Sequence, residues 1–346
     1  MKLGLLPGKF SGRYDINMEL VREAESLGFD SAWTSEAWGN DAITPATWIL
    51  ANTTKLKVGT AIIQMAARTP SMAAMTAMTL NDLSGGRFIL GIGPSGPQVI
   101  EGWHGQVFGR PIARTREYIE IIRNILAREA PLTHKGRHYQ IPFNGDGSTG
   151  LGKALKSIMH GDPSMQIYTA AITPAGLRVS GELADGGFPI YMDPSQFEII
   201  GAPLQEGFAK AGNGKTLADY KVSPFVAVEV GDDIEACRAP VKREMALYIG
   251  GMGARDKNYY NDYAKKLGFE AAAVEIQDHF LAGRRAEAEA AVPNELVDAV
   301  ALVGPKDRII ERAVVWKEAA AKGQIDTMVV RRPTRASMQA IAEAVL

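Results

Sequence analysis

Short apolar runs alternate with amphipathic stretches along most of this chain. An apolar run bounded by turn residues is typical of a buried strand, and apolar residues at helical spacing are typical of a helix with one covered face. The pattern predicts strands over Lys2–Leu6, Phe29–Thr34, Leu56–Ile63, Phe88–Gly91, Gln166–Ala170, Gly186–Tyr191, Lys221–Val230 and Asp326–Val330.

Helices are predicted between these strands. Asp15 is expected to cap the first one, whose apolar face carries Ile16, Leu20, Ala24 and Leu27 and which ends at Gly28. The others are expected over Pro45–Asn52, Ser71–Leu83, Ala113–Arg128, Pro174–Ala184, Pro194–Ala211, a long region from 232 to 292, Pro305–Ala321 and the C-terminus.

Repeated strand–helix units indicate parallel pairing, because a parallel crossover normally needs a helix. Eight such units in 346 residues favour a single (β/α)8 TIM barrel domain over 1–346. Insertions are expected at about 94–112, 131–165 and 232–304, and the second is predicted to contain a hairpin that turns at Lys135-Gly136. A doubly wound open sheet is the alternative.

Composition narrows the possible partners. The chain is 46% hydrophobic with a net charge of −1, and it lacks a dense Lys/Arg run, so nucleic acid and anionic membranes are poor candidates. Neither a signal peptide nor an apolar stretch of ~20 residues is found. The single cysteine, Cys237, suits a reducing compartment and is interpreted as a small apolar helix residue. We therefore expect a cytoplasmic protein that acts on a small molecule.

The fourth predicted strand leads into the most informative loop. Gly91–Gln98 carries little side-chain bulk, so its backbone N–H groups could approach an anion. Glu101, Trp103 and His104 follow at once and could take part in chemistry. The combination favours an enzyme with a phosphorylated cofactor, with an ordinary strand–loop junction as the alternative.

The same loop fits the dinucleotide-binding pattern G-x-G-x-x-G through Gly91, Gly93 and Gly96. In that motif the third glycine opens a helix that meets the pyrophosphate. Here Pro94 and Pro97 interrupt the run, and helical periodicity begins only near residue 113. A Rossmann site is therefore disfavoured.

Several segments together resemble the luciferase-like flavin monooxygenase superfamily, and within it the branch that uses the deazaflavin coenzyme F420. No one of these segments is specific alone, and the resemblance depends on their order and spacing. They are Ser31–Trp38, Val58–Ile63, Arg68–Pro70, Leu83–Phe88, Gly91–Gln98, Glu101–His104, Arg114–Tyr118, Gly181–Gly186 and the region from Val303.

The resemblance implies a barrel with F420, or alternatively FMN, at its C-terminal mouth, and homodimers or larger assemblies. Ala61–Ile62 match a bulge with a non-prolyl cis peptide that supports the ring. The loop after strand five matches a phosphate site at a helix N-terminus. The cofactor contacts implied are Glu36, Ala61, Ile62, Gln64, Ile92, Gly93, Ser95, Gln98, Ile172, Thr173, Ala175 and Gly176.

Two departures limit what the resemblance implies. The F420-dependent sugar-phosphate dehydrogenases have a catalytic histidine where this chain has Ala37, and a glutamate where it has Pro94. Neither that acid–base pair nor a sugar-phosphate substrate is therefore expected.

Glu36 and His104 are the candidate catalytic residues. Glu36 could contact the ring or protonate the substrate, or it could be a surface or helix-capping carboxylate. His104 could be a general acid–base or a structural residue of the loop. Trp38, Trp103 and Tyr191 are candidates for the substrate pocket, with core or rim packing as the alternative. Glu101 is interpreted as bracing the loop through Arg110 or Arg114.

Other motifs are given structural interpretations. Met65, Met72, Met75 and Met78 recur at roughly helical spacing and are expected in the core. His134 and His138 have the spacing of a zinc helix, but Gly136 lies between them in the predicted hairpin, so no metal site is predicted.

The sequence thus predicts an F420-dependent oxidoreductase that moves a hydride between C5 of the deazaflavin and a small alcohol or ketone, enone or pterin. One alternative is an FMN-dependent monooxygenase that uses oxygen and a partner reductase. Another is a barrel that binds cofactor without turnover.

Overall fold

The computed structural model describes residues 1–10 and 12–346. Its strands are β1 (Lys2–Leu6), β2 (Gly8–Phe10), β3 (Tyr14–Ile16), β4 (Ser31–Thr34), β5 (Lys57–Thr60), β6 (Ile63–Gln64), β7 (Phe88–Gly93), β8 (His134–Lys135), β9 (Gln140–Ile141), β10 (Ile167–Thr169), β11 (Gly186–Gly187), β12 (Lys221–Val222), β13 (Phe225–Val230), β14 (Leu302–Gly304) and β15 (Thr327–Arg331).

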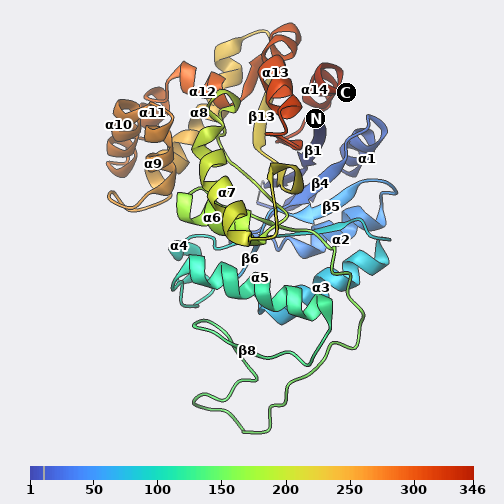
Figure 1. Cartoon of the computed structure of the whole chain (residues 1–346). Helices are drawn as coiled ribbons and strands as arrows, with labels where there is room; N and C mark the ends of the chain where they lie inside the picture. The colour runs from blue at the N-terminus through green and yellow to red at the C-terminus, as the bar shows by residue number, and fades with distance from the viewer. Residues whose placement is uncertain (11) are drawn as a thin grey trace.

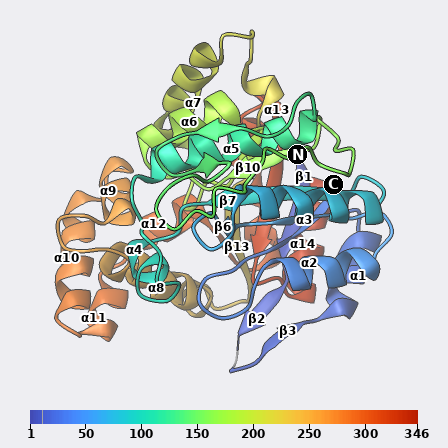
Figure 2. The same cartoon turned by 90° about the horizontal axis from the view of Figure 1, so that it is seen from below.

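The α-helices lie between and after these strands, and Figures 1 and 2 show them around the outside of the sheet. They are α1 (Met18–Ser26), α2 (Ile43–Ala51), α3 (Pro70–Leu83), α4 (Pro97–Ile100), α5 (Pro111–Ala127), α6 (Pro174–Leu183), α7 (Glu198–Ala211), α8 (Ile234–Gly251), α9 (Tyr259–Lys266), α10 (Glu270–Leu281), α11 (Arg285–Ala290), α12 (Asn294–Val300), α13 (Lys306–Ala321) and α14 (Arg335–Val345).

The parallel sheet closes into a barrel. Its order runs β12-β11-β10-β7-β5-β4-β1-β15-β13-β14. β12 and β13 belong to one stretch of chain, interrupted only at Ser223-Pro224, and this stretch pairs with β11 on one side and β15 on the other. The Ser223 N–H donates to the Gly187 carbonyl (2.9 Å) and the Val329 N–H to the Pro224 carbonyl (2.9 Å), so hydrogen bonds cross the seam on both sides.

Within the described residues, each of the eight strand predictions overlaps at least one strand of this ring: Leu56–Ile63 covers β5 and the start of β6, and Lys221–Val230 covers β12 and β13. The predicted barrel is confirmed. The open doubly wound alternative is wrong, because its edge strands would remain unpaired. β14 pairs with the C-terminal part of β13, residues 228–230, and lies outside the ring.

Several boundaries differ from the sequence predictions. Asp15 lies in the β2–β3 hairpin, and Asn17 caps α1 instead by accepting from the Leu20 N–H (3.1 Å). A single helical turn, α4, begins directly after Gly96. The sequence predicted no helix before about residue 113, because four residues are too few to show a helical repeat. The predicted long helical region is divided into α8, α9, α10 and α11.

The prediction that four methionines lie in the core holds for two of them. Met65 and Met78 are buried as predicted, whereas Met72 and Met75 are 53% and 56% exposed, so the prediction is wrong for this pair.

Two apolar layers stabilise the barrel. Trp33, Tyr168, Phe188 and Phe225 fill its interior, with the Trp33 and Phe188 ring centroids 4.8 Å apart. Ala61 and Ile62 pack against this cluster, so the barrel interior supports the bulge after β5. A larger outer layer lies between the strands and the surrounding helices. None of the described helices is long and apolar enough to cross a membrane.

Candidate active site

The sheet order gathers most of the predicted site residues on one arc of the barrel mouth. Strands β4, β5, β7 and β10 are consecutive neighbours, and their C-terminal ends meet at the face where barrel enzymes bind their substrates. Glu36 and Trp38 follow β4, and the 61–64 segment follows β5. The 94–104 loop follows β7, and Ile172 to Gly176 follow β10.

The chain after β5 contains a one-residue bulge. Gly59 faces Ile89 and Ile63 faces Ile92, so four steps along one strand oppose three along the other. The extra residue falls at Ala61–Ile62, where the peptide bond is cis, as the resemblance implies. Pairing resumes in β6 and places Gln64 directly beside Gly93.

Two glycines of β7 are required by close approaches. A Cβ on Gly91 would lie 1.8 Å from the Thr60 carbonyl oxygen, so any side chain there collides with backbone. A Cβ on Gly93 would lie 2.9 Å from the Ile62 side chain. The floor beside the bulge is therefore bare backbone, which suits the face of a flat ring.

The Glu36 carboxylate is hydrogen-bonded to three neighbouring groups and thereby connects the segments of this arc. Its carboxylate accepts from the N–H groups of Ala42 (2.9 Å) and Gln64 (2.8 Å) and pairs with Arg68 (3.1 Å). The Glu36 side chain is 7% exposed. These contacts join the loop after β4 to α2 and β6, and they favour a positioning role over proton transfer. Arg68 was not singled out in the sequence, where it was named only as the first residue of the Arg68–Pro70 segment that resembles the family.

Gln64 contributes a buried acceptor. Its side-chain amide donates to the Ala37 carbonyl (2.7 Å), while Oε1 is buried and finds no hydrogen-bond partner among the described residues. Leaving a buried carbonyl unsatisfied is costly, so an N–H donor of a bound ring fits this position.

The N-terminus of α6 closes the arc and suits an anion. Thr173 caps the helix by accepting from the Gly176 N–H (3.1 Å), and Pro174 occupies the first position. First-turn N–H groups have no helical acceptor, and the helix dipole favours negative charge there. With the bare floor and the Gln64 acceptor, the arc fits a flat ring that carries a phosphate.

The side chains of the loop after β7 differ in how far they are exposed to solvent and in whether they are hydrogen-bonded. Ser95 has a positive φ of 58°, and Gln98 is exposed. His104 is partly buried and its Nε2 has no hydrogen-bond partner among the described residues, so it remains a candidate proton-transfer group. Trp103 is 65% exposed.

Glu101 does brace this loop, but not through an arginine. It accepts from the Phe108 N–H (3.3 Å) instead of pairing with Arg110 or Arg114.

The opposite arc holds a charged cluster that the sequence predictions missed. Tyr191, predicted for the substrate pocket, is buried and donates to Glu244 of α8 (3.1 Å). Glu244 also pairs with Arg331 at the end of β15. Burial, and after it the Glu244 carboxylate, raises the pKa of Tyr191 well above its ordinary value. The signal available in the sequence was the pair of consecutive arginines, Arg331 and Arg332, directly after the predicted strand Asp326–Val330.

A second ion pair extends this cluster. Arg332, with a positive φ of 49°, lies 3.2 Å from Glu229 of β13. Burial raises the pKa of the Glu229 carboxyl, and Arg332 acts against that rise. Each arginine is therefore matched by a carboxylate, and this side of the mouth offers little net positive charge to a ligand.

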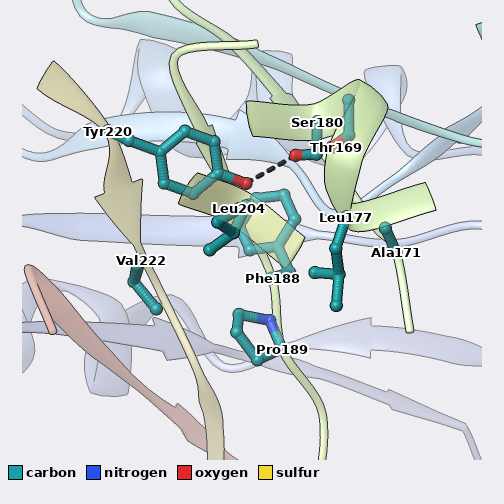
Figure 3. A pocket seen from close by; sticks show the side chains of 10 residues that line it. Thr169, Ala171, Leu177, Ser180, Phe188, Pro189, Leu204, Tyr220 and Val222 are labelled. Atoms are coloured by element: carbon teal, nitrogen blue, oxygen red, sulfur yellow. Dashed lines mark hydrogen bonds between the residues drawn. The ribbon is translucent and has the colours of Figure 1, made fainter. Parts of the chain in front are cut away.

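A hollow of about 10 Å³ lies beside the mouth, between β10, β11, α6 and α7 (Figure 3). Ser180 lies 2.5 Å from both Thr169 and Tyr220, which forms a chain of three hydroxyl groups along one wall. Such a volume holds about one water molecule, so the hollow belongs to packing rather than to ligand binding. A larger one of about 40 Å³ lies at the opposite, N-terminal face.

The sequence profile of one family, the luciferase-like monooxygenases, matches residues 5–323. The chain belongs to this family. The resemblance drawn from its motifs is thereby confirmed, and the chain is an enzyme of the luciferase-like superfamily.

Relatives within the family give a finer comparison. The chain is 43% identical over 329 residues, 94% of its length and 95% of the relative's, to a Mycobacterium tuberculosis protein described as a coenzyme F420-dependent oxidoreductase. The structure of an F420-dependent tetrahydromethanopterin reductase from Methanopyrus kandleri superimposes with a TM-score of 0.77 at 22% identity, over 100% of this chain and 97% of that one. An F420-dependent secondary alcohol dehydrogenase gives 0.72 at 17% identity, over 99% and 98%.

Proposed function

We propose that this protein is an F420-dependent oxidoreductase that moves a hydride between the deazaflavin and a small, uncharged organic substrate. The observation that carries the proposal is the arc from β4 to β10, where the bulge at Ala61–Ile62, the bare backbone at Gly93 and the N-terminus of α6 follow one another around the mouth. The 43% identical relative, described as F420-dependent, supports this cofactor.

F420, when bound, would supply C5 of its deazaflavin as the atom that accepts or donates hydride. The residues of this chain would bind and orient it. Gln64 Oε1 would accept a hydrogen bond from the ring, and the first-turn N–H groups of α6 would hold the phosphate. Glu36 fixes both neighbouring loops through Ala42 and Gln64. His104 is assigned the proton that accompanies hydride transfer, because its Nε2 is not engaged elsewhere.

The substrate class follows from charge at the opposite arc. Arg331 and Arg332 each lie within ion-pair distance of a carboxylate, so their two positive charges are balanced by Glu244 and Glu229, and this arc has no excess charge to attract a phosphate or carboxylate group. Alcohols or ketones, enones and pterins therefore remain the proposed substrates. Trp38 and Trp103, both more than half exposed, are proposed to border the substrate at the rim.

The experiment is a pair of titrations that follow cofactor binding by fluorescence or calorimetry, one with F420 and one with FMN. We expect micromolar or tighter binding of F420 and at least 100-fold weaker binding of FMN. Tight FMN binding, with oxygen consumption when a reductase is added, would instead support the monooxygenase alternative. Tight F420 binding without turnover of any secondary alcohol, enone or pterin would support the non-catalytic alternative.

A further inference from the structure

The strands β13 and β15 both end in charged residues on their inward side. Alternate residues of a strand point to the same face, and Phe225 of β13 and Val329 of β15 belong to the cluster that fills the barrel interior. Glu229, four residues after Phe225, and Arg331, two residues after Val329, therefore face the barrel axis. The apolar interior gives way to charge at the mouth, which is where barrel enzymes bind their substrates.

Arg332 follows directly and has an unusual backbone conformation. Its φ is 49°, in the left-handed region that a residue with a Cβ adopts only at a cost. Such conformations persist where the surrounding structure holds a side chain in a required place. Strand alternation alone points residue 332 away from the axis, but the Arg332 guanidinium lies 3.2 Å from the inward-facing carboxylate of Glu229.

The two sides of the Arg332 guanidinium have different surroundings. Nη1 donates to the Pro240 carbonyl of α8 (3.4 Å) and lies 3.9 Å from the Glu244 carboxylate. Nε and Nη2 form the other edge, and both are buried without a hydrogen-bond partner in the described part of the chain. Nη2 is within ion-pair distance of Glu229, but the carboxylate does not accept a hydrogen bond from it. The unsatisfied edge is therefore the one beside the inward-facing Glu229.

This arrangement balances the charge of Arg332 but leaves two of its donors unused. Glu229 offsets the positive charge, so a second anion gains little at this place. The N–H groups of Nε and Nη2 still need an acceptor, because a buried donor without a partner is costly. The planar guanidinium presents these donors side by side, and a carbonyl oxygen has two lone pairs to receive them. An uncharged carbonyl meets both conditions.

We propose that Arg332 is a specificity-determining residue whose Nε–Nη2 edge donates two hydrogen bonds to an uncharged carbonyl oxygen of the substrate. Glu229 is the positioning residue that keeps this site neutral. The inference rests on the proposed function, and it adds the group that recognises the substrate's oxygen. A substrate that lies between the arc from β4 to β10 and the opposite arc meets this edge on its far side.

Ligand-observed NMR, with saturation transferred from the protein to the ligand, tests the proposal with two probes that share a six-membered ring. Cyclohexanone presents an uncharged carbonyl, and cyclohexanecarboxylate presents an anion. Both are titrated with and without F420. We expect the wild-type chain to bind the ketone about tenfold or more tightly than the carboxylate, because Glu229 repels the anion.

Arg332→Gly removes the donor edge, and glycine suits the left-handed backbone. The dissociation constant for cyclohexanone should rise about tenfold or more, since hydrogen bonds from a charged donor have this weight. Arg128→Gly is the matched control. Arg128 also has a positive φ, 52°, but it caps the C-terminus of α5, at the end of the barrel away from the mouth. This control should bind the ketone like the wild type.

Glu229→Gln tests the charge balance separately, because it removes the carboxylate and keeps the shape of the side chain. The affinity for cyclohexanecarboxylate should increase about tenfold or more, since Arg332 then has no opposing charge on this side. The affinity for cyclohexanone should change by less than about threefold, because the donor edge is retained.

Urea denaturation without cofactor gives a readout that a merely structural role would move. Arg332→Gly should keep or raise the wild-type midpoint, because glycine relieves the positive φ and no unsatisfied donor edge remains. If this variant does not fold, Arg332→Lys replaces it. Lysine keeps the charge opposite Glu229 but lacks the two-donor edge, so ketone binding should still weaken.

Three results overturn the proposal: a wild-type chain that does not prefer the ketone, an Arg332→Gly variant that keeps the preference, and a Glu229→Gln variant that still excludes the carboxylate. None of them depends on the F420 titration. A chain that fails to bind F420 but shows the expected preferences contradicts the proposed function and leaves the role of Arg332 standing.

Discussion

The two candidate catalytic residues differ in how far their polar atoms are already engaged. Glu36 accepts three hydrogen bonds, whereas the His104 Nε2 has no hydrogen-bond partner among the described residues. We expect His104→Gln to lower kcat by about 10²–10⁴-fold and to remove one limb of its pH profile, because general acid–base catalysis has this magnitude. Steady-state kinetics between pH 5 and 9 measure both effects.

Glu36→Gln should act on binding instead. Replacing the carboxylate weakens the contacts to Arg68 and to one backbone N–H, so we expect the F420 dissociation constant to rise about tenfold. The shape of the kcat pH profile should not change. A profile that loses a limb in Glu36→Gln, and keeps it in His104→Gln, would reverse the two roles.

Gly91 and Gly93 provide a matched pair on one strand. A Cβ at Gly91 meets the Thr60 backbone at 1.8 Å, whereas the nearest atoms to one at Gly93 belong to the Ile62 side chain, at 2.9 Å. Gly91→Ala should lower the free energy of unfolding by about 3 kcal/mol, at the upper end of overpacking effects. Gly93→Ala should keep most of the stability but weaken F420 binding about tenfold. Urea denaturation and cofactor titration separate the two outcomes.

At the scale of elements, one carboxylate attaches the β8–β9 hairpin to α5 of the barrel. Glu117 of α5 accepts from the N–H groups of Arg137 (2.9 Å), His138 (2.9 Å) and Tyr139 (3.0 Å) in the turn between β8 and β9. Burial alone would raise the pKa of Glu117, but these backbone donors outweigh it and lower the pKa. The contribution of Glu117 to stability is therefore fully present above the ordinary pKa of a glutamate and is lost as the pH falls through its lowered pKa in the folded protein.

Glu117→Gln should mimic this loss at neutral pH. We expect hydrogen exchange of the 137–139 amides to accelerate at least tenfold, because a neutral amide is a weaker acceptor for three donors. Glu120→Gln on the same helix is the control. The Glu120 side chain is 43% exposed, and its ion pair with Arg116 is long, at 4.0 Å. Equal exchange in both variants would contradict the assigned anchor.

A second contact between elements joins α8 to the barrel mouth. Arg331 is 16% exposed and Glu244 is 17% exposed, so removing the Glu244 charge leaves a largely buried cation without its partner. Glu244→Gln should lower the free energy of unfolding by about 3 kcal/mol. Arg243→Gln on the same helix, at a side chain 70% exposed, should change it by less than about 0.5 kcal/mol. Urea denaturation of both variants makes the comparison.

At the scale of the whole molecule, the ring of strands could be predicted because each strand is a short buried run with a helix after it. The bulge at Ala61–Ile62 could be placed only through family resemblance, since its local sequence reads as one continuous strand with Leu56–Ile63. The cluster of Tyr191, Glu244 and Arg331 joins residues up to 140 positions apart. The consecutive arginines are visible in the sequence, but nothing local indicates which residues they pair with, and only the closed fold brings the three together.

The lone thiol of the chain has a practical consequence. Cys237 is buried on α8, and burial raises the pKa of its thiol above the ordinary value, so it reacts slowly with alkylating reagents. A cysteine introduced at an exposed position such as Thr149 would therefore take up a maleimide dye almost alone. Native protein can thus be given one spectroscopic reporter at a chosen place without first removing any residue.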